Sequence, residues 1–188
     1  MKLLHLDSSI LGENSVSRAV SAAIAGQLAK THPGLETIYR DLVADPLPHL
    51  TLPALADPTL VDEFLGAGIV VIGAGMYNFS LPSQLKAWID RVLIAGKTFK
   101  YGPNGAEGLA GGKRVIVALA RGGKYGGESP AVSAEHAETY LRSVFGFIGV
   151  TDVEFIIAEG IALGPDQRQS ALSDALAAAG NVQALKAA

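Results

Sequence analysis

Two long apolar runs limit the possible folds of this chain more than any other feature. The sequence GIVVIGAG spans residues 68–75, GKRVIVALA spans residues 112–120, and neither run alternates between apolar and polar side chains. A strand that is apolar on both faces must be buried on both, as happens in parallel sheets with helices on each side. The two runs therefore predict central strands of a parallel α/β sheet.

The rest of the chain alternates between further strands and segments of helical periodicity. Strands are predicted at residues 2–7, 35–42 and 152–160, a short helix at 60–66, and an irregular Pro-rich segment before it. In the longer helices, apolar residues recur at intervals of three and four and should face the core. These residues are Val16, Val20, Ala23, Ile24 and Leu28; Leu85, Ile89 and Val92; Ala137, Tyr140, Leu141, Val144, Phe145 and Ile148; and Leu172, Leu176 and Ala179.

Charge and length argue against several classes of partner. The 188 residues suit one compact domain. The net charge is −3, and Lys and Arg are scattered along the chain, so no basic patch is predicted that would bind nucleic acid or an anionic membrane. The first ten residues, MKLLHLDSSI, fit neither a signal peptide nor a transit peptide, and no run approaches the roughly 20 apolar residues of a membrane span. We expect a soluble, cytoplasmic protein.

The lack of cysteine removes thiol chemistry, disulfides and Cys-ligated metal centres from consideration. The four histidines, His5, His32, His49 and His136, are widely spaced, so we expect no metal site. Hydrophobic residues make up 49% of the chain, and the mean hydropathy is +0.31. These values are high for a soluble chain of this size and predict a homo-oligomer with a buried apolar interface.

Ligands of parallel sheets bind beyond the carboxyl ends of the strands, which directs attention to three loops. In the first, residues 7–17, serine hydroxyls and the free N–H groups of a helix start could bind a phosphate. Simple capping by Asn14 or Ser15 would use the same donors, and this reading is favoured for the loop alone. The chain lacks both G-x-G-x-x-G and G-x-x-x-x-G-K-[ST], which weakens the case for a Rossmann dinucleotide site or a P-loop.

The second and third loops indicate a flat ligand. Met76-Tyr77-Asn78-Phe79 offers aromatic faces and an amide, although the aromatics could pack under the sheet, with Pro82 as the first helical residue. RGGKYGG, residues 121–127, allows close backbone approach, and a mobile surface loop is an equally good reading of it alone. Together the three loops suit an elongated ligand with a phosphate at one end and a planar ring at the other. FMN has that shape, and a flavin would supply the reactivity that the side chains lack.

Five segments resemble the FMN-dependent NADH:quinone oxidoreductases of the azoreductase family. They are SSILGENSVS, MYNFSLPSQLKAWIDR, AGKTFKYGPNGAEGL, RGGKYGG and FGFIGVTDVEFIIAEGIALGP, and the similarity runs nearly end to end. The resemblance implies a single flavodoxin-like FMN-binding domain over residues 1–188. Its fold would be a five-stranded parallel sheet in the order 2-1-3-4-5, with helices on both faces.

The resemblance also implies where the cofactor binds. The phosphate would contact Ser9, Ser15, Val16 and Ser17; the ribityl chain and ring would contact Met76, Tyr77, Asn78 and Phe79; and Ala120, Arg121, Gly122 and Gly123 would lie on the other side of the ring. The chain departs from the family pattern with Gly75 where Pro is usual, with Ala120 where many members have Ser, and with Tyr125 where some have His. No catalytic residue is assigned, but Tyr125 could stack near the flavin or donate a hydrogen bond.

The implied activity is a ping-pong reaction in a homodimer. NADH or NADPH would reduce the flavin, and the flavin would then pass two electrons to a quinone or an aromatic azo compound in the same pocket. Residues 46–60 are shorter than in many relatives, and they would wall the pocket for the acceptor. The alternatives are a flavodoxin-like FMN-binding electron carrier without NAD(P)H turnover, a receiver-type signalling domain and a redox-inactive structural flavoprotein.

Overall fold

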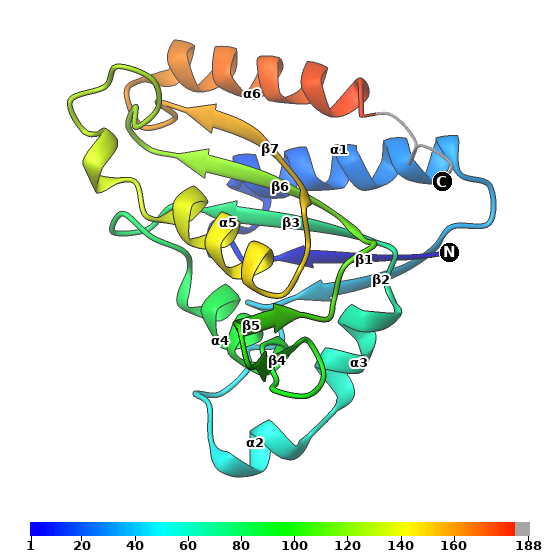
Figure 1. Cartoon of the computed structure of the whole chain (residues 1–188). Helices are drawn as coiled ribbons and strands as arrows, with labels where there is room; N and C mark the ends of the chain where they lie inside the picture. Colours follow the sequence, from blue (N-terminus) through cyan, green and yellow to red (C-terminus); the bar gives the residue numbers. More distant parts are fainter. Residues whose placement is uncertain (183–188) are drawn as a thin grey trace.

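The computed structural model describes residues 1–182, and a five-stranded parallel sheet forms its centre (Figure 1). The strands are β1 (Lys2–Asp7), β2 (Glu36–Asp41), β3 (Ile69–Gly75), β6 (Arg114–Arg121) and β7 (Asp152–Glu159). Their order across the sheet is β2-β1-β3-β6-β7. This is the predicted order 2-1-3-4-5 once the strands of the main sheet are counted along the chain. Both apolar runs are the central strands β3 and β6, as predicted.

Helices cover both faces of the sheet, and each face has its own core (Figure 1). Helices α1 (Val16–Thr31) and α6 (Pro165–Gly180) pack on one face, and α3 (Thr59–Gly66), α4 (Ser83–Val92) and α5 (Ala137–Phe147) pack on the other. On this second face the large rings of Phe64, Trp88 and Phe145 lie in contact. Among the described residues, no helix is both long and apolar enough to cross a membrane.

The predicted core faces of α1, α4 and α5 are largely correct, but that of α6 is correct only at Ala179 and in part at Leu172. Leu176 is 38% exposed and Leu172 is only partly buried, whereas Ala171, Ala175 and Ala179 are buried. The small alanine side chains, spaced four residues apart, allow α6 to lie close to α1 and β7. The prediction followed the larger apolar residues and missed this close approach.

Two elements were not predicted. An antiparallel hairpin of β4 (Phe99–Gly102) and β5 (Gly105–Gly108) lies outside the main sheet, and α2 (Leu52–Ala56) forms within the Pro-rich segment that was expected to be irregular. The hairpin packs against the end of α5, where a Cβ on Gly108 would lie 2.2 Å from the backbone nitrogen of Gly149. The motif AGKTFKYGPNGAEGL therefore contains a structural element whose glycine permits close packing of two backbones.

Candidate functional site

A hollow of about 250 Å³ lies at the carboxyl ends of β1, β3 and β6. The strand order reverses between β1 and β3, which is where parallel sheets bind their ligands. The hollow is lined by Ser9, Leu11, Ser15, Val16, Ser17, Gly75, Met76, Tyr77, Ala120, Gly122, Ile161, Ala162 and Arg168. All three predicted loops contribute, and a fourth segment after β7 joins them.

The start of α1 gathers hydrogen-bond donors at one end of the hollow. Ser15 is the N-cap, and its Oγ accepts from the backbone N–H of Arg18 at 3.3 Å. The hydroxyl of Ser17 lies 3.1 Å from that of Ser15, and both residues are buried. The N–H groups of Val16 and Ser17 precede the first intrahelical bond, so helix geometry leaves them free for a ligand. Capping by Ser15 and an anion site at the helix start can therefore coexist.

Arg168 is a site residue that the sequence analysis missed. It lies in the first turns of α6, lines the same hollow as the serines, and donates a hydrogen bond from its guanidinium to the carbonyl of Asn14. Its position follows from the topology, because α6 starts at the sheet edge where β7 ends. In the sequence, Arg168 is only a basic residue three positions after Pro165, and this pattern alone does not indicate a ligand site.

Tyr77 joins the first loop to the second. Its hydroxyl lies 3.0 Å from the Oγ of Ser9 and accepts from the backbone N–H of Ile10 at 3.2 Å. A Cβ on Gly75 would lie 3.2 Å from the Cζ and hydroxyl of this ring. The lack of a side chain at Gly75 therefore leaves room for the Tyr77 ring to pack against the strand end.

The tetrad of residues 76–79 runs into a tight turn between Tyr77 and Ser80. Tyr77 and Ser80 exchange two backbone hydrogen bonds of 3.0 and 3.1 Å, while Asn78 and Phe79 have φ values of 48° and 70°. This is the pattern of a type I′ turn, which costs free energy at a residue such as Phe79 that has a large side chain. Neither Asn78 nor Phe79 lines the hollow, and Phe79 is 51% exposed.

Pro82 caps α4 rather than beginning it. The helix starts at Ser83, and Pro82 has φ −57° and ψ 140°, an extended ψ that keeps it outside the helix. The prediction that Pro82 is the first helical residue is therefore wrong by one position.

The loops that follow β6 and β7 are hydrogen-bonded to each other beyond the sheet. Backbone N–H groups of Gly160, Ile161 and Ala162 donate to the carbonyls of Gly123, Arg121 and Gly122 at 2.9, 3.2 and 3.0 Å, respectively. This pairing places Ile161 and Ala162 opposite Gly122 as one wall of the hollow. Ile161 and Ala162 belong to the closing motif FGFIGVTDVEFIIAEGIALGP, from which no individual site residue was predicted.

The side chain of Arg121 turns away from the hollow into a buried ion cluster. The guanidinium of Arg121, 2% exposed, contacts the carboxylates of Glu159, Glu138 and Glu135 at 2.8, 2.7 and 3.2 Å. Burial alone would raise the pKa of Glu138, but hydrogen bonds from Arg142 and Arg121 outweigh it and hold that pKa below its ordinary value. The two arginines thus stabilise the ionised form of Glu138.

The ion cluster also connects the loops that surround the hollow. Glu159 accepts from the backbone N–H of Tyr125 at 3.0 Å, which fixes the glycine loop. The Glu135 carboxylate accepts from backbone N–H groups at the start of α5, and next to it the N–H of His136 donates to the carbonyl of Phe79 at 3.0 Å. The rings of Phe79 and Tyr125 meet edge to face, with centroids 6.2 Å apart.

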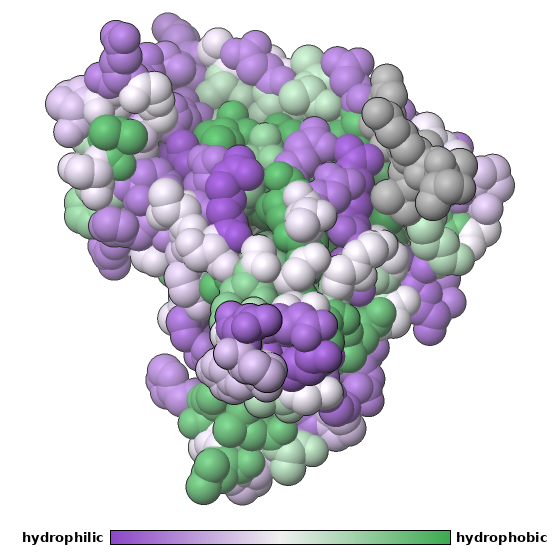
Figure 2. Space-filling view, in the orientation of Figure 1, coloured by the Kyte–Doolittle hydropathy of each residue, from purple (hydrophilic) through white to green (hydrophobic). Residues whose placement is uncertain are grey.

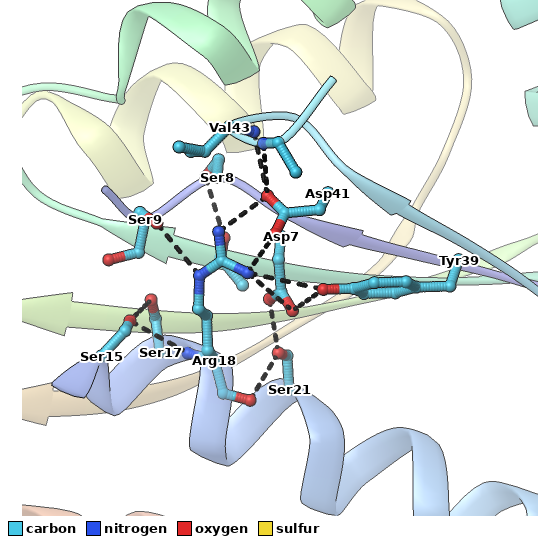
Figure 3. Close-up of polar contacts among 12 residues, drawn as sticks. Asp7, Ser8, Ser9, Ser15, Ser17, Arg18, Ser21, Tyr39, Asp41 and Val43 are labelled. Carbon is cyan, nitrogen blue, oxygen red and sulfur yellow. Dashed lines mark hydrogen bonds and ion pairs between the residues drawn. The ribbon is translucent and has the colours of Figure 1, made fainter. Parts of the chain in front are cut away.

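A second polar network stabilises the first loop (Figure 3). Arg18 forms two hydrogen bonds of 2.7 Å with Asp41 and donates from Nε to the carbonyl of Ser9 at 3.0 Å. The buried Asp7 accepts from Ser21 at 2.8 Å and from Tyr39 at 3.1 Å. The hydrogen bonds from Arg18 lower the pKa of Asp41 to about 2, and burial raises the pKa of Tyr39 to about 12. Sequence reasoning gave no role to Arg18 or Asp41.

The matches with known proteins agree with this arrangement. Residues 1–182 match the protein family described as having a flavodoxin-like fold. The chain is 59% identical to FMN-dependent NADH:quinone oxidoreductase from Methylorubrum extorquens, with 100% of both chains covered. The chain belongs to the FMN-dependent NADH:quinone oxidoreductase family. The family resemblance and the flavodoxin-like fold expected from the sequence are both confirmed.

Solved structures place the azoreductases close to this member of the quinone oxidoreductase family. Azoreductase AzrA has a TM-score of 0.87 and 30% identity, covering 96% of this chain and 97% of that chain. An FMN-dependent NADH-azoreductase from Bacillus anthracis, in complex with FMN, has a TM-score of 0.83 and 25% identity, covering 95% and 98%. The similarity therefore extends to structures of the azoreductase branch over nearly the whole chain.

The Arg18–Asp41 pair should make the stability of this family member depend on pH. Folding lowers the pKa of Asp41 from 3.8 to about 2. Asp41 thus stabilises the fold above its unfolded-state pKa, and this contribution is lost as pH falls through about 2. We expect Asp41→Asn to lower the free energy of unfolding by about 2 kcal/mol at pH 7 and to approach the stability of the parent near pH 2, as measured by urea unfolding.

Asp174→Asn, at an exposed position on α6, is the control and should change the free energy of unfolding by less than about 0.5 kcal/mol. If Asp41→Asn were less stable than the parent by the same amount from pH 7 to pH 2, the Arg18–Asp41 pair would not be the source of the pH dependence.

Proposed function

We propose that this chain is an FMN-dependent oxidoreductase that uses NADH or NADPH to reduce quinones and aromatic azo compounds in two-electron steps. Its relatives carry names for the NADH:quinone and azoreductase activities. The observation that carries the proposal is the hollow itself, which has hydroxyl and N–H donors at one end and aromatic and glycine walls beside them. We propose that residues 1–188 act as one flavin-binding domain.

The residues of the hollow fit FMN. Ser15, Ser17 and the start of α1 offer hydroxyl and backbone donors, which suit a phosphate. Met76 and Tyr77 would face one side of the ribityl chain and ring, and Gly122 the other, with Ile161 and Ala162 beside it. A volume of about 250 Å³ is slightly below the usual range for small-molecule sites, so part of the flavin would lie along the rim. Ser9 would contribute mainly by fixing Tyr77.

The chain's own residues would position the reactants and exclude water. Bound FMN supplies the chemistry, because it can take a hydride from a nicotinamide and return two electrons to a second substrate. Gly122 allows close approach over the ring, while the ion cluster fixes the loop that carries it. Phe79 and Tyr125 form an aromatic rim against which both substrates would stack in turn, as a ping-pong reaction requires. Tyr125 is proposed as a stacking residue.

We also propose that the working unit is a homodimer. Three apolar residues at loop ends beside the hollow, Ile10, Phe79 and Leu163, are 58%, 51% and 62% exposed. A second apolar area covers α2, where Leu52 is 84% exposed (Figure 2). Exposed apolar surface of this kind is typical of contacts between subunits. A partner subunit would also complete the shallow site. The cytoplasmic location expected from the sequence stays a prediction.

Turnover distinguishes the enzyme from an electron carrier. We expect the purified protein to be yellow with a flavin spectrum, and to oxidise NADH or NADPH rapidly when a quinone or an azo dye is added. Flavin binding without NAD(P)H oxidation would favour the carrier and overturn the proposal. Initial rates at varied concentrations of both substrates should give parallel double-reciprocal lines, as a ping-pong reaction does.

Removing one hydroxyl at the start of α1 should weaken FMN binding. We expect Ser15→Ala and Ser17→Ala each to weaken it by roughly 1.5–3 kcal/mol, the range for hydrogen bonds to charged groups, as measured by quenching of FMN fluorescence. Ser15→Ala should also lower the free energy of unfolding by about 1 kcal/mol, because it removes the N-cap. Ser143→Ala, on the exposed side of α5, is the control and should leave FMN affinity unchanged. Unchanged affinity in both serine variants would exclude this phosphate assignment.

A further inference from the structure

Arg168 is the one charged side chain among the residues that line the hollow in the described part of the chain. The serine hydroxyls and backbone N–H groups beside it are neutral donors. A terminal phosphate carries a charge of about −1.5 to −2 at pH 7, and removing it from water is costly unless a cation accompanies it. The donor cluster therefore lacks a positive charge unless Arg168 supplies it.

Arg18, the other arginine near the first loop, already has protein partners for its guanidinium. Both terminal nitrogens of Arg18 donate hydrogen bonds to Asp41, and its Nε donates to the Ser9 carbonyl. The buried Asp7 and the acidic Glu13 of the short 3-10 turn Gly12–Asn14 add negative charge to the same loop. Apart from the partial positive charge at the start of α1, the charges of this loop therefore oppose a phosphate unless another cation offsets them.

The contacts of Arg168 leave it available for this role. One guanidinium nitrogen donates to the carbonyl of Asn14, and an arginine has five N–H donors in all. Within the described residues Arg168 forms no ion pair with a carboxylate. The bond to Asn14 holds the side chain across the gap between α6 and the start of α1. Its charge is thus positioned before any ligand arrives, which lowers the entropic cost of binding.

We propose that Arg168 binds the terminal phosphate of the flavin and makes the protein select FMN over riboflavin. This inference rests on the proposed function, because it assumes that a flavin occupies the hollow. Riboflavin has the same ring and ribityl chain but no phosphate, so it would gain nothing from Arg168. The selectivity between the two flavins, rather than flavin binding as such, is what this residue determines.

Titration with the two flavins tests the proposal. The full-length protein, stripped of bound flavin, would be titrated with FMN and with riboflavin while flavin fluorescence is followed, in the parent, Arg168→Gln and Arg168→Lys forms. We expect Arg168→Gln to weaken FMN binding roughly 10- to 100-fold and to change riboflavin binding less than about 2-fold. Arg168→Lys should restore part of the FMN affinity, since lysine keeps the charge but loses the forked donors. Lys30→Gln, at the far end of α1, removes the same charge and should affect neither flavin.

The outcomes separate this inference from the proposed function. A parent protein that binds neither flavin would overturn both. A parent protein that binds FMN, with an Arg168→Gln form of unchanged FMN affinity, would overturn only the role of Arg168. An equal loss of FMN and riboflavin affinity would also overturn it, because Arg168 would then act only by fixing Asn14. Retained riboflavin binding in Arg168→Gln shows that the variant is folded, so a loss confined to FMN supports the proposal.

Discussion

Replacing Arg121 by methionine is expected to lower the free energy of unfolding by about 3–5 kcal/mol, the cost of breaking a buried ion pair by removing one partner. The carboxylates of Glu135, Glu138 and Glu159 would lose their shared cation, and Glu135 is only 6% exposed. FMN affinity should fall as well, because Glu159 and Glu135 fix the loop at Tyr125 and the start of α5. Urea unfolding at pH 7.5 and FMN titration measure the two effects.

Arg142→Gln is the matched control for Arg121. Arg142 pairs with the same Glu138, but its side chain is 51% exposed, so its loss should cost less than about 1 kcal/mol. Acid should reduce the loss of stability in Arg121→Met, because the pKa of Glu138 is lowered in the folded parent, and the stability that this carboxylate contributes is lost as the pH falls. A deficit below 1 kcal/mol at pH 7.5 would show that the cluster does not stabilise the fold.

Gly73→Ala is expected to have a similarly large effect. A Cβ on Gly73 would lie 2.2 Å from an Asp7 carboxylate oxygen, 2.8 Å from the Ser21 hydroxyl and 3.2 Å from the Ser17 carbonyl. The added methyl group must break the buried Asp7–Ser21 hydrogen bond or move α1 away from β3. Overpacking and the lost bond together predict a decrease of about 3–5 kcal/mol in the free energy of unfolding. Displacement of Ser17 should also weaken FMN binding.

Gly26→Ala separates this clash from the general effect of replacing a glycine. Gly26 lies within α1, and a Cβ there would meet nothing within 4 Å. This change should raise the free energy of unfolding by about 0.5–1 kcal/mol, because alanine favours a helix. Thermal unfolding of both variants makes the comparison. A Gly73→Ala protein as stable as the parent would mean that β3 and α1 can separate at little cost.

The sequence predicts the sheet well because its strands are buried on both faces. Apolar runs such as residues 69–75 and 115–120 are most stable at the centre of a covered parallel sheet. The core face of α6 was predicted only in part, for a different reason. Alanine gains little from burial, so a ranking by hydrophobicity passes over Ala171 and Ala175, although a close helix contact needs them. The hairpin β4–β5 was missed because short, exposed strands have little hydrophobic pattern to detect.

The residues of the site, too, could be predicted from the sequence only in part. Topology alone brings the three predicted loops to one edge, and many of their residues line the hollow. Arg121 was assigned with its neighbours, yet side chains alternate along a strand, so Ala120 and Gly122 face the hollow while Arg121 faces α5. That alternation was visible in the sequence. The contribution of Arg168 was not, because it depends on how α6 lies against the start of α1.

The backbone hydrogen bonds between the loops after β6 and β7 have a dynamic consequence for the site. Gly160, Ile161 and Ala162 lie beyond the end of β7, but each backbone N–H donates to a carbonyl at the end of β6 or in the loop that follows it. Their hydrogen–deuterium exchange should be slow and should track the opening of β7, whereas the tip amides of Asn78 and Phe79 should exchange much faster. One wall of the hollow would thus share the rigidity of the core, and motion that admits a substrate would be confined to the opposite wall.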